Sequence, residues 1–127
     1  MIPFTEIFPS FSVDDLKKAK AFYRDVVGIP VSELPNGLSL QIAVDHFAFV
    51  YPSTNHKPAD FTVLNFRVDS VDEAVDELNK MGVEMLQYGG SIATDEKGVK
   101  RHGPGPVVAW FKDPAGNILS VMEQMPR

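Results

Sequence analysis

The side chains of this chain that could carry out acid–base chemistry or bind a metal are its carboxylates and its three histidines, because the chain has no cysteine. The lack of cysteine excludes disulfides, thiolate metal ligands and a cysteine nucleophile. His56 and His102 lie in segments rich in proline or glycine, and neither has a second histidine at the close spacing of a metal-binding pair. We interpret both as surface residues. No spacing singles out an acid–base dyad, and Glu96, His102, His46 and Tyr88 stay open as candidates.

Two polar residues, Asn65 and Arg67, interrupt the apolar stretch from Phe61 to Val68. Because side chains alternate along a strand, these two residues are expected to share one face of it. The planar guanidinium of Arg67 suits a carboxylate, a phosphate or a carbonyl group. The alternative, which the sequence leaves open, is that both side chains satisfy backbone groups or a carboxylate at the rim of a sheet.

The elements that position these residues occur twice along the chain. Residues 11–16 align with residues 66–71 at a constant shift in numbering. Each copy is an alternating apolar stretch, then an acidic or hydroxyl helix cap, then an amphipathic helical pattern. A repeat of this kind predicts an α+β fold built from two βαβββ modules, residues 1–58 and 59–127, within a single domain of residues 1–127.

The limits of the elements follow from turn and cap residues. We expect helices from Asp15 to Gly28 and from Ser70 to Gly82, since each begins at a side chain that can cap and ends at a glycine. We expect a linker over residues 52–58 and a long loop over 89–106. The expected strands are residues 4–13, three segments between 31 and 51, and residues 61–68, 83–86, 107–111 and 118–123.

Composition limits the partners of the protein. The formal net charge is −5, and no basic run is present, so we expect neither nucleic acid nor an anionic membrane surface as a partner. No apolar run approaches the length needed to cross a bilayer, and the start of the chain does not read as a secretion signal. We therefore expect a cytoplasmic protein.

Two motifs give the chain a family resemblance. One is the closing segment from Trp110 to Asn117, and the other is a helix-start pattern of Val13, Asp14, Leu16, Ala19, Phe22 and Tyr23. With the two βαβββ modules, they resemble the vicinal oxygen chelate superfamily, which includes glyoxalase I, extradiol dioxygenases, fosfomycin-resistance enzymes and bleomycin-binding proteins. The resemblance implies an open, incomplete mixed β-barrel with helices outside, a binding site in the hollow between the modules, and a homodimer.

Metal-using members of that superfamily carry His or Glu near the start and the end of each module. At the corresponding places this chain has Phe8, Ala48, Val63 and Ser120. Two apolar side chains, an alanine and a hydroxyl do not supply the imidazole or carboxylate ligands of a divalent metal. The departure favours the branch that binds a small molecule without a metal, and we expect no cofactor.

An error in register would restore a metal site. Side chains two residues apart in a strand point to the same face, so Glu6 would share a face with Phe8, and His46 with Ala48. Glu123 lies three residues after Ser120 and would point to the opposite face. The alternative function is therefore an enzyme of the lyase, isomerase or dioxygenase type. Otherwise Glu6 and Glu123 are solvent-facing charges, and His46 is a turn residue.

The same parity predicts the lining of the site. Trp110 or Phe111, depending on the length of the last turn, is expected beside Ser120 as a surface for stacking a planar group. The candidate ligand-binding residues are Phe8, Ser10, Ser12, Ala48, Val63, Asn65, Arg67, Trp110 and Ser120. A lid over the site is expected from Glu96, Lys97, Arg101 and His102, in the glycine-containing loop.

Overall fold

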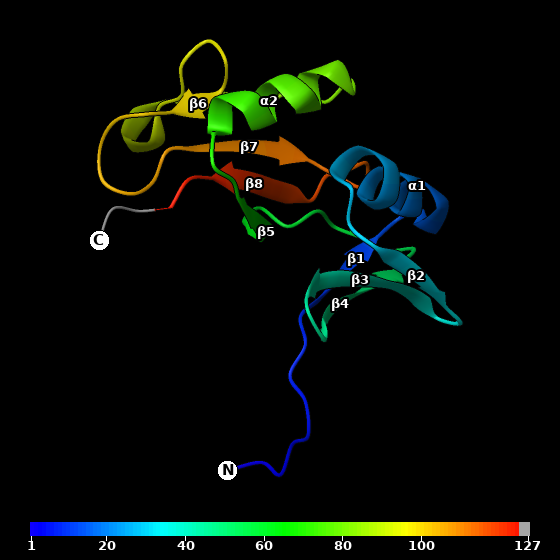
Figure 1. Ribbon diagram of the computed structural model, residues 1–127. Coiled ribbons are helices and arrows are strands. Elements are labelled where there is room, and N and C mark those ends of the chain that lie inside the picture. Colours follow the sequence, from blue (N-terminus) through cyan, green and yellow to red (C-terminus); the bar gives the residue numbers. More distant parts are fainter. Residues whose placement is uncertain (125–127) are drawn as a thin grey trace. The chain divides into compact units, whose positions relative to one another are not determined.

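The computed structural model describes residues 1–124, and the chain separates into two compact units, Met1–Pro58 and Ala59–Arg127. Each unit holds a four-stranded mixed sheet and one main helix (Figure 1). The fold is α+β with a repeated module, and neither sheet closes on itself. Residues 125–127, the end of the expected second module, lie outside the described part of the chain.

The first unit forms one sheet in the order β1-β4-β3-β2. The strand β1 pairs in parallel with β4, and the other pairs are antiparallel. Its elements are β1 (Ser10–Val13), α1 (Leu16–Ala21), η1 (Phe22–Val27), β2 (Val31–Leu34), β3 (Gly37–Ala43) and β4 (His46–Pro52).

The helix of the first unit begins and ends at the expected residues. The Asp15 carboxylate accepts a hydrogen bond from the Lys18 backbone N–H at 3.0 Å, and Gly28 ends the helix with a φ of 88°. Its second half, η1, is π-helical. The wider turn lets the consecutive residues Phe22 and Tyr23 both lie in the core, at 8% and 0% exposure.

The second unit repeats this plan with the sheet order β5-β8-β7-β6, in which β5 and β8 are parallel. Its helix packs on β7 and β8. The elements are β5 (Thr62–Arg67), α2 (Val71–Lys80), the short 3₁₀ turn η2 (Gly90–Ile92), β6 (Val99–Lys100), β7 (Val108–Lys112) and β8 (Ile118–Met122).

The helix α2 follows its expected pattern. The Ser70 hydroxyl accepts from the Glu73 backbone N–H at 3.2 Å and so caps the first turn. Val71, Val75 and Leu78 share one stripe and are buried against the sheet. The helical pattern in the sequence is therefore sufficient to place this element.

The turn between β7 and β8 is held by a buried carboxylate. Asp113, 4% exposed, accepts through Oδ1 from the backbone N–H groups of Ala115 and Asn117, both at 2.9 Å. The Asn117 side-chain amide donates to Asp113 Oδ2 at 3.1 Å. These bonds fix a five-residue turn, so Lys112 faces Ile118 in the register of the two strands.

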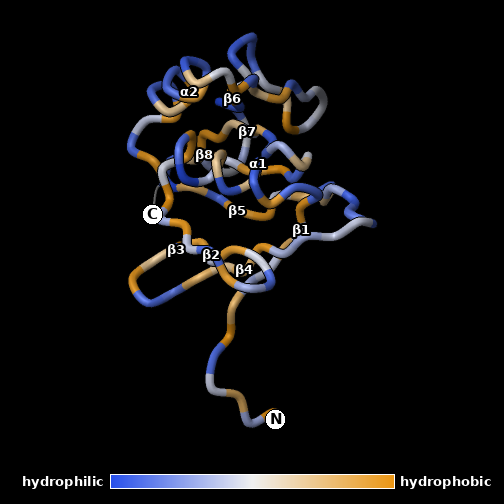
Figure 2. Tube along the Cα trace, turned by 90° about the vertical axis from the view of Figure 1, so that its right-hand side faces the viewer, coloured by the Kyte–Doolittle hydropathy of each residue, from blue (hydrophilic) through white to orange (hydrophobic). Residues whose placement is uncertain are grey.

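The first expected strand, residues 4–13, is wrong over its first part. Pairing with β4 begins only at Ser10, and residues 1–9 are all exposed. Pro9 has no N–H to extend the pairing toward the N-terminus. Figures 1 and 2 show this extended N-terminal segment, with apolar residues along its length.

The expected strand at 83–86 is also wrong, because that segment forms only one isolated bridge, between Met85 and Phe111. The edge of β7 is instead paired over Val108 and Ala109 by β6, which lies inside the segment expected to be a loop. The strand β7 offers five residues, so β6 and Met85 divide its free edge between them.

Candidate functional site

The face of the first sheet opposite α1 carries a row of aromatic side chains. Along β4, Ala48 and Val50 are buried at 1% and 0% exposure, whereas Phe47, Phe49 and Tyr51 alternate with them on the open face. The rings of Phe49 and Tyr51 are stacked, with centroids 5.9 Å apart and an interplanar angle of 23°. This row is a flat apolar surface that side chains of the unit leave partly uncovered.

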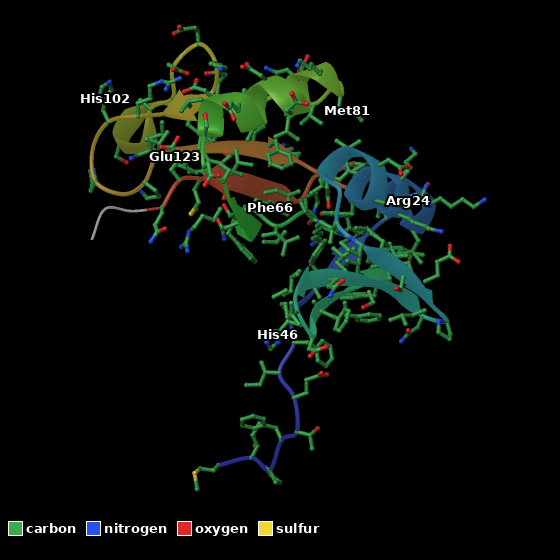
Figure 3. All side chains as sticks on the ribbon, viewed as in Figure 1. Arg24, His46, Phe66, Met81, His102 and Glu123 are labelled. Carbon is green, nitrogen blue, oxygen red and sulfur yellow. The ribbon has the colours of Figure 1, made fainter. Side chains whose placement is uncertain are left out.

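A pocket of about 310 Å³ opens on this face. The N-terminal segment forms one wall, and the turns between β2, β3 and β4 form the others. Figure 3 labels His46 at one of these turns. The lining residues are Glu6, Ile7, Phe8, Leu34, Asn36, Ser39, Asp45, His46, Phe47, Ala48 and Phe49.

The ionisable groups of this pocket are mainly acidic. Glu6 and Asp45 contribute two carboxylates, and His46 follows Asp45 in the same turn. All three side chains are exposed. Across residues 1–124, neither carboxylate takes part in an ion pair. Their charge is therefore available to a cationic ligand.

The expected residues of the first unit fall into two groups. Ser10 and Ser12 lie on the open face, because they face Phe49 and Tyr51 in the register of β1 and β4. Phe8, 54% exposed, lines the pocket from the N-terminal segment. Ala48 lies in the row buried beneath the sheet, although it also borders the pocket, so its expected position on the open face is wrong.

A hydrogen bond that the sequence did not indicate joins Ser12 to His56. The Ser12 Oγ lies 2.7 Å from His56 Nδ1, and both residues are partly buried. The residues are 44 positions apart, and His56 lies in the segment after β4 rather than in a strand. No local pattern could have found this pair, which places an imidazole beside a hydroxyl on the open face.

The open face of the second sheet is polar. Asn65, Ser120 and Trp110 face one another across β5, β8 and β7. The Ser120 hydroxyl, fully buried, donates to Asn65 Oδ1 at 2.6 Å. Arg67 lies on the same face of β5 and is exposed. The register also decides between the two aromatic candidates, since Trp110 faces Ser120 while Phe111 is buried on the side of α2.

The structure does not bring metal ligands together at the places suggested by the resemblance. Val63 lies at a register shift between Thr62 and Leu64 and is half-buried. In the part of the chain that the structure describes, no three side chains of the His, Asp or Glu type are close enough to hold a metal ion.

Glu123 has a structural partner that the sequence did not reveal. Its Oε2 accepts a hydrogen bond from the Val71 backbone N–H at 3.0 Å, beside the amino end of α2 (Figure 3). The first N–H groups of a helix lack partners within the helix, and a negative charge there is favourable. The residue considered as a metal ligand or a solvent-facing charge therefore caps a helix.

The loop residues expected to form a lid contact α2. Lys97 pairs with Asp72 and Asp76, and Arg101 pairs with Asp72 and Asp95, at distances from 2.7 to 3.0 Å. The hydrogen bond from Arg101, followed by that from Lys97, holds the pKa of Asp72 well below its usual range. A hydrogen bond from Arg101 also lowers the pKa of Asp95. These pairs tie the loop to the helix.

The other two residues of the expected lid, Glu96 and His102, are exposed. A lid role for the loop remains a prediction. Across residues 1–124, no helix is long and apolar enough to cross a membrane.

Comparison with known proteins agrees with this fold. The Bacillus subtilis (strain 168) protein named Uncharacterized protein YraH is 25% identical over 128 residues, covering 89% of this chain and 93% of its own length. The fosfomycin resistance protein FosX from Listeria monocytogenes superposes with a TM-score of 0.69 at 16% identity, over 98% of this chain and 96% of FosX. The antibiotic binding protein TnmS3 from Streptomyces sp. CB03234 has a TM-score of 0.64 at 24% identity, over 98% and 100% of the two chains.

The family comparison covers most of the chain. The model of the Glyoxalase/Bleomycin resistance protein/Dioxygenase superfamily matches residues 9–121, which include every strand and helix of both units except the last residue of β8, Met122. The resemblance drawn from the motifs is confirmed, and this chain belongs to the glyoxalase/bleomycin resistance protein/dioxygenase superfamily.

Proposed function

We propose that the protein binds a small, flat, positively charged molecule in the pocket of the first unit and does so without a divalent metal ion. The observation that carries the proposal is the pocket of about 310 Å³ in which aromatic rings meet two carboxylates. Its size is at the lower end of the range for small-molecule sites, and its mixture of apolar walls and few polar groups is typical of them.

The aromatic lining supports a flat ligand. Phe47 and Phe8 leave 44% and 54% of their surface exposed, although burial of such rings is favourable. A planar ligand stacked on Phe47 and Phe49 would cover this surface. The TnmS3 protein is an antibiotic binding protein of the same fold, which agrees with a binding role, whereas the ligand class follows from the residues of the pocket.

The charge of the pocket supports a cation. Glu6 and Asp45 lie at its border, and the net charge of the whole chain is −5. A metal-free mode is supported by Phe8 and Ser120, which the resemblance places where metal-using members carry ligands and which have no imidazole or carboxylate.

A matched pair of probes tests the proposal by isothermal titration calorimetry. The cation 9-aminoacridine and the anion acridine-9-carboxylate share a flat ring system, and we expect the cation to bind about tenfold tighter or better, a difference of about 1.4 kcal/mol. Equal affinity for the two probes, or no heat with either, would reject the proposal.

Variants place the binding in the pocket. Phe47→Ala is expected to weaken binding of 9-aminoacridine about tenfold, since an aromatic contact contributes about 0.5 to 1.5 kcal/mol beyond its buried area. Phe61→Ala is the matched control, because Phe61 is 66% exposed and does not line the pocket. Asp45→Asn removes the charge with little strain, since Asn tolerates the φ of 58° at this position.

Treatment with a chelator tests the metal-free part separately. We expect the affinity of the chelated protein for 9-aminoacridine to be unchanged. If binding disappears with the chelator and returns with a divalent ion, the alternative of a metal-dependent lyase, isomerase or dioxygenase replaces this proposal. Two further expectations, a homodimer and a cytoplasmic location, remain predictions, and light scattering after gel filtration tests the first.

The contact between Ser12 and His56 favours a second candidate function, metal-independent acyl chemistry. With Nδ1 as the acceptor at 2.7 Å, His56 can take the hydroxyl proton as Ser12 Oγ attacks an activated ester. The ester then loses its alcohol and leaves an acyl group on the serine. Incubation with 4-nitrophenyl acetate should release 4-nitrophenolate and add an acetyl group to Ser12, and both effects should vanish in Ser12→Ala. Release that persists in Ser12→Ala would exclude this function.

A further inference from the structure

We propose that the open face of the second sheet is a separate binding site for an aromatic carboxylate. The site consists of Asn65, Arg67, Ser120 and Trp110, and it goes beyond the pocket proposed in the first unit. Its donors point to an acceptor ligand, whereas the carboxylates of the first pocket suit a cation.

The hydrogen bond between Ser120 and Asn65 determines which groups are left for a ligand. The Ser120 hydroxyl has one proton and gives it to Asn65 Oδ1 at 2.6 Å. Ser120 is fully buried and Asn65 is exposed, so the bond anchors the Asn65 amide to the sheet and holds it in one orientation. The bond fixes which end of the amide is the oxygen, so the NH₂ group with its two donors is left for a ligand, while one of the two acceptor sites of the oxygen is taken.

Arg67 adds a positively charged donor beside this amide. It lies two residues after Asn65 on the same face of β5, about 7 Å further along the strand. Within residues 1–124 its guanidinium has neither an ion pair nor a hydrogen bond to another side chain. A carboxylate accepts without donating, and it matches both the amide and the planar guanidinium.

The remaining charge on this face is also positive. The register places Lys112 on the same side of β7 as Trp110, and the open-face positions paired between β5, β7 and β8 hold no acidic residue. The side chain of Lys112 is exposed. Lys112 pairs with Ile118, however, four residues along β8 from the partner of Arg67, so its exposed charge is too far away to act strongly on an anion at Arg67. An anion there meets the guanidinium and no carboxylate on these strands.

The Trp110 side chain favours an aromatic ligand over other small anions. It lies in the same cross-strand row as Ser120 and Asn65, which places its backbone about 10 Å from that of Asn65. The Tyr88 ring packs edge-on against the indole, with centroids 5.2 Å apart, and holds it in place while leaving Trp110 partly exposed. An aromatic ring beside the indole can extend a carboxylate toward Asn65 and Arg67.

The chain offers a direct probe, because Trp110 is its single tryptophan and gives one indole N–H signal in a proton–nitrogen correlation spectrum. We expect sodium benzoate to shift this signal and saturate, with a dissociation constant about tenfold or more below that of benzamide, since charged hydrogen bonds are the stronger ones. Benzylamine, which has the ring but a positive charge, should not shift it.

Three variants test the roles of the donors. Arg67→Gln and Asn65→Asp should each weaken benzoate binding about tenfold, the second by replacing a donor with a negative charge of the same shape. Lys80→Gln is the control, since it removes one positive charge from the exposed surface of α2 and should leave benzoate binding within about twofold. The unchanged backbone signals of each variant verify its fold.

The proposal is overturned if benzoate gives no saturable shift, if benzamide binds as tightly, or if Lys80→Gln weakens binding as much as Arg67→Gln. The last result would mean that benzoate responds only to net charge. None of these outcomes bears on 9-aminoacridine binding at Phe47, so failure here is distinguishable from failure of the proposed function.

Discussion

Replacement of Glu123 tests whether this carboxylate caps α2 or belongs to a metal site. Two variants separate the parts of the interaction. Glu123→Ala removes both the acceptor for the Val71 N–H, now 3.0 Å away, and a negative charge beside the helix N-terminus. Glu123→Gln keeps an acceptor oxygen and removes only the charge.

The structure sets the expected magnitudes. Loss of a helix-capping hydrogen bond costs about 1 kcal/mol, and loss of the charge near the helix dipole costs about 0.5 kcal/mol. Glu123→Ala should therefore lower the free energy of unfolding by about 1.5 kcal/mol, and Glu123→Gln by about 0.5 kcal/mol. For a chain of 127 residues, with an unfolding entropy of about 2.1 cal/mol/K per residue, these values lower the thermal midpoint by about 6 °C and 2 °C.

The assay is thermal unfolding followed by circular dichroism, with and without a chelator. Glu77→Gln serves as the control, because its carboxylate lies on the exposed surface of the same helix, paired with Lys80 at 3.2 Å, and its loss should cost less than about 0.5 kcal/mol. If Glu123→Ala leaves the midpoint of the protein unchanged, the hydrogen bond to Val71 is not formed. If the chelator alone lowers the midpoint as far as Glu123→Ala does, the carboxylate acts through a metal and the capping role is refuted.

Two further substitutions test other parts of the fold. Asp72→Asn should lower the thermal midpoint at pH 7 by no more than the equivalent of about 1 kcal/mol, since the ion pair with Arg101 is about 40% exposed and screened by solvent. The pKa of Asp72 is depressed in the folded protein, so this stabilisation is present above the unfolded pKa of about 3.9 and is lost as pH falls toward the folded value. The difference in thermal midpoint between wild type and variant should therefore shrink in acid. A difference that does not shrink would contradict the pairing of Asp72 with Arg101. Gly37→Ala should lower the free energy of unfolding in urea by about 1 to 3 kcal/mol, because the new methyl group would overlap the Val50 carbonyl oxygen and lie 2.9 Å from Cε1 of Phe49. An unchanged free energy would mean that β3 and β4 do not approach each other this closely at Gly37.

The elements that could be predicted from the sequence are those defined by neighbouring residues. The caps at Asp15 and Ser70 are bonds to an N–H three residues away, so the pattern alone contains both partners. The turn from Asp113 to Asn117 is equally local. By contrast, the fourth strand of the second sheet depends on which of two segments reaches the edge of β7, and the local sequence does not decide that competition.

The candidate site was predicted less completely because it depends on register. A shift of one residue moves a strand side chain to the opposite face, which is why Ala48 was expected where Phe47 and Phe49 lie. The positions of Asn65 and Arg67 were predicted to share a face, and the strand pairing places them on one. The partner of Ser12 was missed because His56 follows the last strand of its unit, where no alternation of side chains predicts the direction of a residue.

The two copies of the module differ in kind on the two faces of their sheets. On the face covered by the helix, the parallel strands of both units pair a phenylalanine with a valine, Phe11 with Val50 and Phe66 with Val121. The next buried pair differs, since Leu40 and Ala48 of the first unit correspond to Phe111 and Leu119 of the second. Packing beneath the helix therefore keeps apolar character in both copies, but not residue identity.

On the open face the two units have different residues at equivalent positions. The first unit pairs Ser10 with Phe49, so the ring lies on the central strand and the hydroxyl on the edge, whereas the second pairs Asn65 with Ser120. In both pairs a larger side chain lies beside a small one, but the larger side chain is apolar in the first unit and polar in the second. On the buried face one apolar side chain replaces another, whereas on the open face the exchange changes the chemistry of the surface. Rings beside carboxylates in the first unit and hydrogen-bond donors in the second support the two ligand classes proposed for them, a cation and a carboxylate.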